Sequence, residues 1–109
     1  MKKAFISGPV SGKNPQQVAE DFEARERILI KQGYYVVNPV WLIATKNLKL
    51  AMMGLPPWTD EQNRREIMGV CISWLALCDE IHMLPDWQYS EGACIEHKVA
   101  AMLKMKIVY

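Results

Sequence analysis

The sequence has almost no net charge and no long apolar run. Its 109 residues include 13 basic and 12 acidic side chains, for a formal net charge of +1. Because a protein that binds a nucleic-acid backbone usually carries a basic surface, this balance argues against a nucleic-acid partner. The longest apolar stretch, residues 67–78, is well short of the roughly 20 residues that a membrane-spanning helix needs. We therefore expect no membrane partner, and a ligand that is a small molecule.

Cysteine is also scarce, and the amino-terminal segment lacks the pattern of a secretory signal. The three cysteines, Cys71, Cys78 and Cys94, form an odd set without a C-x-x-C pair, which is typical of reduced thiols inside the cell. The first apolar stretch covers only residues 4–6 before a glycine and a proline, which is shorter than a signal peptide requires. These two features predict a cytoplasmic protein.

Half of the residues are hydrophobic, which is enough for the core of one domain over residues 1–109. Within it, short apolar runs alternate with helical patterns. Strands are predicted at residues 3–7, 34–37, 80–84 and 106–108. Helices are predicted at residues 14–33, 59–77 and 90–103. This alternation predicts an α/β fold, with a parallel sheet and helices on both of its faces.

Capping signals support two of these helices. Asn14 and Pro15 supply an N-cap and a proline at the first helical position, and Gly33 ends the pattern. Thr59 and Gln62 form a capping box ahead of a helix whose second half is more apolar. The apolar residues in 40–58 follow neither the helical nor the strand period. This segment is interpreted either as a partly helical loop lying over a site or as a disordered loop.

A parallel sheet of this kind binds ligands beyond the carboxyl ends of its strands, so the loops at residues 8–14 and 85–90 are the ones to inspect. The first loop resembles a phosphate-binding loop, but its glycines are too close together and Asn14 replaces the Ser or Thr that would hold magnesium. A plain turn and a sugar-binding or phosphate-binding loop both remain open. Cys78 with His82, and Cys94 with His97, have spacings seen in zinc sites, although buried thiols and surface histidines are the commoner explanation.

Residues 86–96 carry the most chemical information. The helix that starts near Ser90 offers backbone amides and a hydroxyl to an anion, and Trp87 or Tyr89 precedes it as a stacking partner for a base. Glu96 lies later on this helix, on a mostly apolar face, where burial raises the pKa of a carboxylate unless donors hold it ionised. The alternative is that Glu96 lies at the edge of that face beside Lys98 or Lys104 and is solvated.

The order of several short motifs resembles the nucleoside 2-deoxyribosyltransferase superfamily, in particular its short phage and bacterial members of uncertain activity. The similarity runs over nearly the whole chain. The motifs are Phe5-Ile6-Ser7-Gly8-Pro9, Gly33, Val36-Val37-Asn38-Pro39, Cys78-Asp79-Glu80-Ile81, Leu84-Pro85, Trp87, and Ser90-x-Gly92-Ala93-x-x-Glu96.

The resemblance implies a flavodoxin-like three-layer sandwich, with a small, mostly parallel sheet of about four or five strands. It also implies cleavage or transfer at an N-glycosidic bond of a nucleoside or nucleoside 5′-monophosphate. This reaction needs no metal or organic cofactor. The resemblance further implies a homodimer or a larger homo-oligomer. Glu96 occupies the position of the nucleophile that attacks C1′ of the sugar. The residues expected to bind substrate are Ser7, Gly8, Pro9, Asp79, Trp87, Ser90 and Gly92.

Two positions depart from the family pattern. Phe5 stands where many members have a tyrosine whose hydroxyl orients the glutamate, and Cys71 stands where they have an aspartate that acts at the base or sugar. Ser90 matches the related nucleotide hydrolases, whereas the transferases have an aspartate there, which favours a 5′-phosphorylated substrate. Three hypotheses follow: an N-glycosidic enzyme, a module of the same fold that binds a nucleotide but has lost catalysis, and a scaffold that binds no nucleoside.

Overall fold

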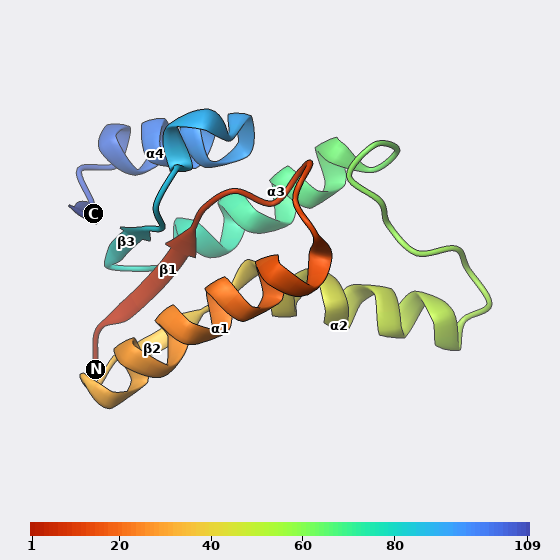
Figure 1. The fold of residues 1–109 in the computed structure, drawn as a ribbon, viewed down its shortest axis with the longest axis horizontal. Coiled ribbons are helices and arrows are strands. Elements are labelled where there is room, and N and C mark those ends of the chain that lie inside the picture. Colours follow the sequence, from red (N-terminus) through yellow and green to blue (C-terminus); the bar gives the residue numbers. More distant parts are fainter.

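Four parallel strands form the central sheet of the protein (Figure 1). The computed structural model describes residues 1–109. The strands are β1 (Lys3–Ser7), β2 (Tyr35–Val37), β3 (Glu80–Met83) and β4 (Lys106–Val108), in the order β2-β1-β3-β4. Every neighbouring pair is parallel. The predicted flavodoxin-like three-layer α/β fold is therefore confirmed.

The helices lie on both faces of this sheet. The chain runs from β1 to β2 in one direction across the sheet and then returns past β1 to β3 and β4. Since crossovers between parallel strands are right-handed, this reversal places α1 (Pro15–Lys31) on one face and α3 (Arg64–Leu75) and α4 (Glu91–Met102) on the other. None of the helices is long and apolar enough to span a bilayer.

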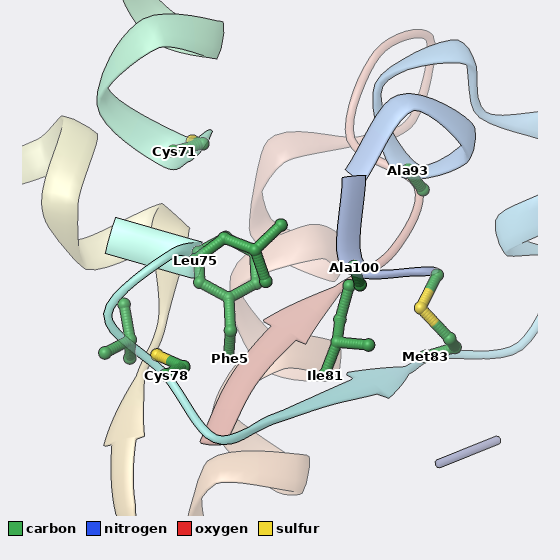
Figure 2. Close-up of a cluster of buried hydrophobic side chains, with 9 residues drawn as sticks. Phe5, Cys71, Leu75, Cys78, Ile81, Met83, Ala93 and Ala100 are labelled. Atoms are coloured by element: carbon green, nitrogen blue, oxygen red, sulfur yellow. The ribbon is translucent and has the colours of Figure 1, made fainter. Parts of the chain in front are cut away.

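Alternating residues of β1 supply two separate cores. Ala4 and Ile6 pack against α1, whereas Phe5 packs against α3 and α4. In the larger core, the ring of Phe5 faces Leu75 of α3 (Figure 2). Ser7 lies on the same face of β1 as Phe5, because side chains alternate along a strand. Its hydroxyl is therefore directed toward α4.

Most predicted elements agree with the structure to within two residues at each end. In α1, the side chain of Asn14 accepts hydrogen bonds from the backbone N–H groups of Gln16 and Gln17. The main addition is α2 (Pro39–Met52), which occupies much of the segment that the sequence left unassigned. It begins with the same Asn-Pro signal: the side chain of Asn38 accepts a hydrogen bond from the N–H of Val40.

The predicted helix at residues 59–77 is wrong at its start. The capping box forms a local contact, since the N–H of Gln62 donates to Oγ1 of Thr59 at 3.2 Å, but it closes only a turn. The side chain of Asn63 accepts from the N–H of Thr59 at 3.1 Å, and the helix begins at Arg64. The turn at residues 60–62 is thereby held outside the helix, at the end of the sheet where the strands finish.

The carboxyl ends of β1 and β3 lie very close together. A Cβ atom added to Gly8 would lie 2.7 Å from Cβ of Leu84, so no larger residue fits there without a shift of the backbone. The N–H of Leu84 also donates to the carbonyl of Ser7 at 2.8 Å. These contacts fix the position of Ser7 and of the loop that follows it.

Candidate active site

A buried carboxylate lies at the carboxyl end of β1. Glu96 of α4 is 7% exposed, and Oγ of the fully buried Ser7 donates to its Oε1 at 2.6 Å. Burial raises the pKa of Glu96 to about 7, and the hydrogen bond from Ser7 opposes this shift. Both protonation states are thus populated near neutral pH. The solvated alternative for Glu96 is excluded by its burial.

Glu96 faces a cavity of about 330 Å³. This volume lies in the range of pockets that hold small molecules. The walls come from the loop after β1 and from all four helices. Apolar side chains form one part of the wall: Val18, Phe22, Val40, Ile43, Ile67 and Met68. Polar and charged side chains form another part: Ser11, Lys13, Asp60, Arg64 and Glu96.

Cys71 also lines this cavity, two helical turns after Arg64 at the start of α3. The pKa of its thiol is raised to about 12, mainly by burial and to a smaller extent by the negative charges of Glu96 and Asp60. The thiol is therefore protonated at physiological pH. It is neither an effective proton donor nor a thiolate nucleophile.

Three of the eight residues predicted for the site line the cavity: Gly8, Gly92 and Glu96. Ser7 does not line the cavity, but its hydroxyl donates a hydrogen bond to Glu96. Gly92 brings the first turn of α4 close to Met68 of α3, since an added Cβ would lie 3.7 Å from the Met68 sulfur. The structure therefore brings together the central part of the predicted site.

The other four residues lie elsewhere. Oδ2 of Asp79 accepts from the N–H of Lys3 at 2.8 Å, at the amino end of the sheet. The indole of Trp87 stacks on the imidazole of His97 with ring centroids 4.3 Å apart. Ser90 caps α4, since its Oγ accepts from the N–H of Ala93 at 3.3 Å. Pro9 lines a second, separate hollow.

Two charged residues at the cavity were missed as site residues, namely Asp60 and Arg64. Asp60 was interpreted only as part of a helix cap, and Arg64 carried no motif. Nζ of Lys13, from the loop that the sequence did single out, lies 3.3 Å from Oδ2 of Asp21. The guanidinium of Arg64 lies 2.8 Å from Oε2 of Glu91, the first residue of α4. The only signal for these two residues in the sequence was that charged side chains lie in and next to the capping box at residues 59–62.

The side chains considered for zinc are each bonded to other groups. Sγ of Cys78 contacts the carbonyl of Trp74, and Nε2 of His82 lies 2.9 Å from Glu80. No group of three or more His, Cys, Asp or Glu side chains is arranged to hold a metal ion. His97 lies 2.9 Å from the hydroxyl of Tyr109.

Comparison with known proteins assigns the chain to a family without assigning an activity. No curated protein and no solved structure matches it significantly. Residues 2–109 match the family model described as "Domain of unknown function (DUF4406)". Because this match covers nearly the whole sequence, including the loop after β1 and all of α4, the cavity and Glu96 lie within the shared domain. The chain therefore belongs to the DUF4406 family.

Proposed function

We propose that this protein cleaves or transfers the N-glycosidic bond of a nucleoside or nucleoside 5′-monophosphate, with Glu96 as the nucleophile. The observation that carries the proposal is a buried glutamate, held by Ser7, that faces a cavity of about 330 Å³. A buried carboxylate with one hydrogen-bond donor and no ion pair is costly to bury, which favours a functional role. The ordered resemblance to nucleoside 2-deoxyribosyltransferases supports the same reaction.

The chemistry requires one fixed carboxylate at the sugar. As the base leaves, C1′ acquires positive oxocarbenium character, and the ionised Glu96 captures it to form a glycosyl-enzyme ester. Water then releases the free sugar, or a second base accepts it. Ser7 takes the orienting role that a tyrosine at residue 5 would have, since Phe5 is fully buried in the core and offers no hydroxyl.

The two parts of the cavity wall fit the two parts of a nucleotide. The apolar side chains that α1, α2 and α3 contribute offer a surface for a base. The cations Lys13 and Arg64 offer ligands for a 5′-phosphate, which supports a phosphorylated substrate. Both cations have acidic partners, Asp21 and Glu91, which a phosphate would displace or share.

The experiment is a panel of ribonucleosides, deoxynucleosides and their 5′-monophosphates, incubated with the protein and followed for free base by chromatography. We expect release from at least one compound, with monophosphates preferred over the matching nucleosides. Repeating the reaction with an added acceptor base separates transfer from hydrolysis. Absence of release from every compound, with and without acceptor, would contradict the proposed activity.

The second candidate is a nucleotide-binding module without catalysis. Cys71 favours it, because a protonated thiol with a pKa of about 12 stands on the cavity wall where the nucleoside 2-deoxyribosyltransferases that the sequence resembles have a carboxylic acid. A ligand-induced rise in melting temperature without base release identifies this module. No response in either assay leaves the scaffold hypothesis.

We also propose that the protein acts as a homodimer or larger homo-oligomer, with residues 48–55 in the interface. Figure 1 draws α2 and the loop after it extending away from the sheet. Leu48 is 63% exposed and Met52 is 81% exposed, which is unusual for neighbouring apolar side chains on one helix. A second copy covering this segment removes that apolar surface from water.

Light scattering tests the assembly. The wild-type protein is expected to have at least twice the mass of one chain, and the double variant Leu48→Lys/Met52→Lys is expected to shift toward the mass of one chain. Met102→Lys is the matched control, since Met102 is equally exposed, at 81%, but lies on α4. A wild-type protein with the mass of a single chain contradicts the assembly.

The proposed compartment is the cytoplasm, and the proposed partners are small molecules. All three cysteines are free, and two of them are buried as thiols in the core. Reduced thiols of this kind are typical of proteins in a reducing compartment. No cofactor or metal is required by the proposed reaction.

A further inference from the structure

No cation lies beside the buried carboxylate of Glu96. Its Oε1 accepts one hydrogen bond from a neutral hydroxyl, and no lysine, arginine or histidine nitrogen lies within ion-pair distance of either oxygen. The two cations on the cavity wall, Lys13 and Arg64, each pair with a carboxylate that does not line the cavity. Without a counter-charge, burial dominates and raises the pKa of Glu96 to about 7.

A positive charge on a ligand would supply this missing counter-charge. An opposite charge within about 4–6 Å of a carboxylate favours the ionised form and lowers its pKa. The wall also carries a second negative charge, Asp60, from the turn at residues 60–62. Besides the larger effect of burial, both carboxylates raise the pKa of the Cys71 thiol, which lies on the same wall. This part of the cavity therefore favours a cation over a neutral or negative group.

The cavity wall offers no proton donor for a leaving base. The Cys71 thiol, with a pKa of about 12, is too weak an acid. Asp60 is exposed and acts on Cys71 as a negative charge, so it has no proton to give in that state. Lysine and arginine, the two cations of the wall, hold their protons near neutral pH. Since Glu96 itself must be ionised to attack the sugar, a base leaves this cavity without taking up a proton from the protein.

Both properties of the wall select the same class of N-glycoside. A base ring that carries a positive charge while bound to C1′, as in a pyridinium or an N7-alkylated purine, becomes neutral when the bond breaks. We propose that the substrate is a nucleotide with such a cationic base, which pairs with the ionised Glu96 in the cavity. This inference rests on the proposed function, because it names the substrate class of the same site. The apolar side chains of the wall accommodate the flat ring.

The reaction balances without an acid. The Glu96 carboxylate forms a bond to C1′, and the bond between C1′ and the base nitrogen breaks with its electron pair on the nitrogen, which neutralises the ring. Water then attacks C1′, Glu96 leaves as a carboxylate, and one proton from the water passes to bulk solvent. Where a neutral pyridine attacks C1′ instead, it becomes the cationic base of the product, and no proton is exchanged.

Two purine nucleotides that differ by one methyl group test the substrate class. N7-methylguanosine 5′-monophosphate has a cationic base, whereas guanosine 5′-monophosphate has a neutral base on the same sugar phosphate. Proton donation to a leaving group contributes about 10²- to 10⁴-fold to the rate. Because the cavity lacks a donor, kcat/KM for release of the methylated base should exceed that for release of guanine by at least about 10²-fold. A smaller ratio overturns the cationic substrate while leaving the nucleophile in place.

A pyridinium nucleotide, nicotinamide mononucleotide, distinguishes the two sources of a cationic base. Release of nicotinamide supports the pyridinium class, and release of methylguanine without nicotinamide supports the alkylated purines. Glu96→Gln should lose activity on both cationic compounds, because both need the nucleophile. Glu61→Gln is the matched control: it removes an exposed carboxylate that does not line the cavity, and it should retain the wild-type rates.

The pairing between the base and Glu96 has a readout of its own. The pH profile of kcat/KM reports the ionisation of the free protein, and the single-turnover rate at saturating protein reports that of the complex. With a cationic substrate bound, the midpoint of the single-turnover rate should lie at least about one pH unit below the midpoint of kcat/KM near pH 7. Coincident midpoints would show that the base does not pair with Glu96, and they overturn the inference.

The remaining outcomes separate this inference from the proposed function. A loss of rate on guanosine 5′-monophosphate alone, in Asp60→Asn or in Cys71→Ala, would identify a proton donor on the wall and overturn the cationic substrate. Release of neutral bases without release of either cationic base overturns it as well and keeps the proposed function. Absence of base release from all three compounds and from the nucleoside panel overturns both.

Discussion

Glu96→Gln is expected to abolish base release, with a loss in kcat/KM of at least about 10³-fold. Glutamine keeps the size of the side chain and an oxygen that accepts the hydrogen bond from Ser7, but it cannot form the ester with C1′. The measurement is initial rate of base release on the best substrate of the nucleoside panel. A variant that retains more than a tenth of the wild-type rate contradicts a nucleophilic role.

The same substitution should stabilise the fold, which provides a control for correct folding. The pKa of Glu96 is raised from 4.5 to about 7, so the folded state favours the protonated carboxyl. Its contribution to stability is fully present below about pH 4.5 and is lost as the pH rises through 7, by about 3 kcal/mol in total. Glutamine never ionises. We therefore expect Glu96→Gln to unfold at higher temperature than the wild type at pH 8, with a smaller difference at pH 5.

Ser7→Ala is expected to shift the pH dependence of the reaction upward. The hydrogen bond from Ser7 lowers the pKa of Glu96 against the larger effect of burial. A hydrogen bond to a charged group contributes about 1.5–3 kcal/mol, and one pKa unit corresponds to about 1.4 kcal/mol. Because the nucleophile must be ionised, the rising limb of kcat/KM near pH 7 should move up by about one to two pH units.

Ser90→Ala is the matched control for this shift. The Ser90 hydroxyl caps α4, the helix that carries Glu96, but it bonds to the N–H of Ala93 rather than to the carboxylate. Loss of the cap should cost about 1 kcal/mol of stability and leave the midpoint of the pH profile in place. An unchanged midpoint in Ser7→Ala, or an equal shift in Ser90→Ala, would show that Ser7 does not set the ionisation of Glu96.

The strands and three of the helices follow from local signals. β1 is a short apolar run that ends at Gly8, and α1 has an Asn-Pro cap and a regular apolar face. Residues 40–58 were predicted only as a partly helical or a disordered loop, and the structure places α2 over most of them. Large apolar side chains of this helix, such as Trp41 and Leu48, are exposed, so its apolar residues do not all share one buried face. Its cap at Asn38 was interpreted as the end of a strand.

The candidate site was predictable where it depends on the topology and not where it depends on tertiary contacts. Parallel strands bring their carboxyl ends to one edge, which places the loop at residues 8–14 beside the start of α4. The same rule places Asp79 at the opposite edge, since it precedes β3. The turn that brings Asp60 to the cavity is fixed by the hydrogen bond between Asn63 and Thr59. The spacing of apolar residues in the sequence does not predict such a contact.

The role proposed for Glu96 also rests on more than the sequence. The apolar face around Glu96 indicated burial, but burial alone does not distinguish a structural carboxyl from a reactive one. The structure adds that Ser7, which lies 89 positions away at the end of β1, donates a single hydrogen bond of 2.6 Å to this carboxylate. The register of β1 against β3 and the packing of α4 on the sheet set that distance.

Covalent trapping tests the role of Glu96 most directly. A nucleotide of the preferred base with fluorine at C2′ is expected to form the glycosyl-enzyme ester. This ester then hydrolyses slowly, because the fluorine destabilises the positive charge that develops at C1′. Intact-protein mass spectrometry should detect one added fluorosugar phosphate, or fluorosugar, per chain, and peptide mapping should place it on Glu96. An adduct on another residue, or turnover of the natural substrate without any adduct in the trapping reaction, would contradict the account.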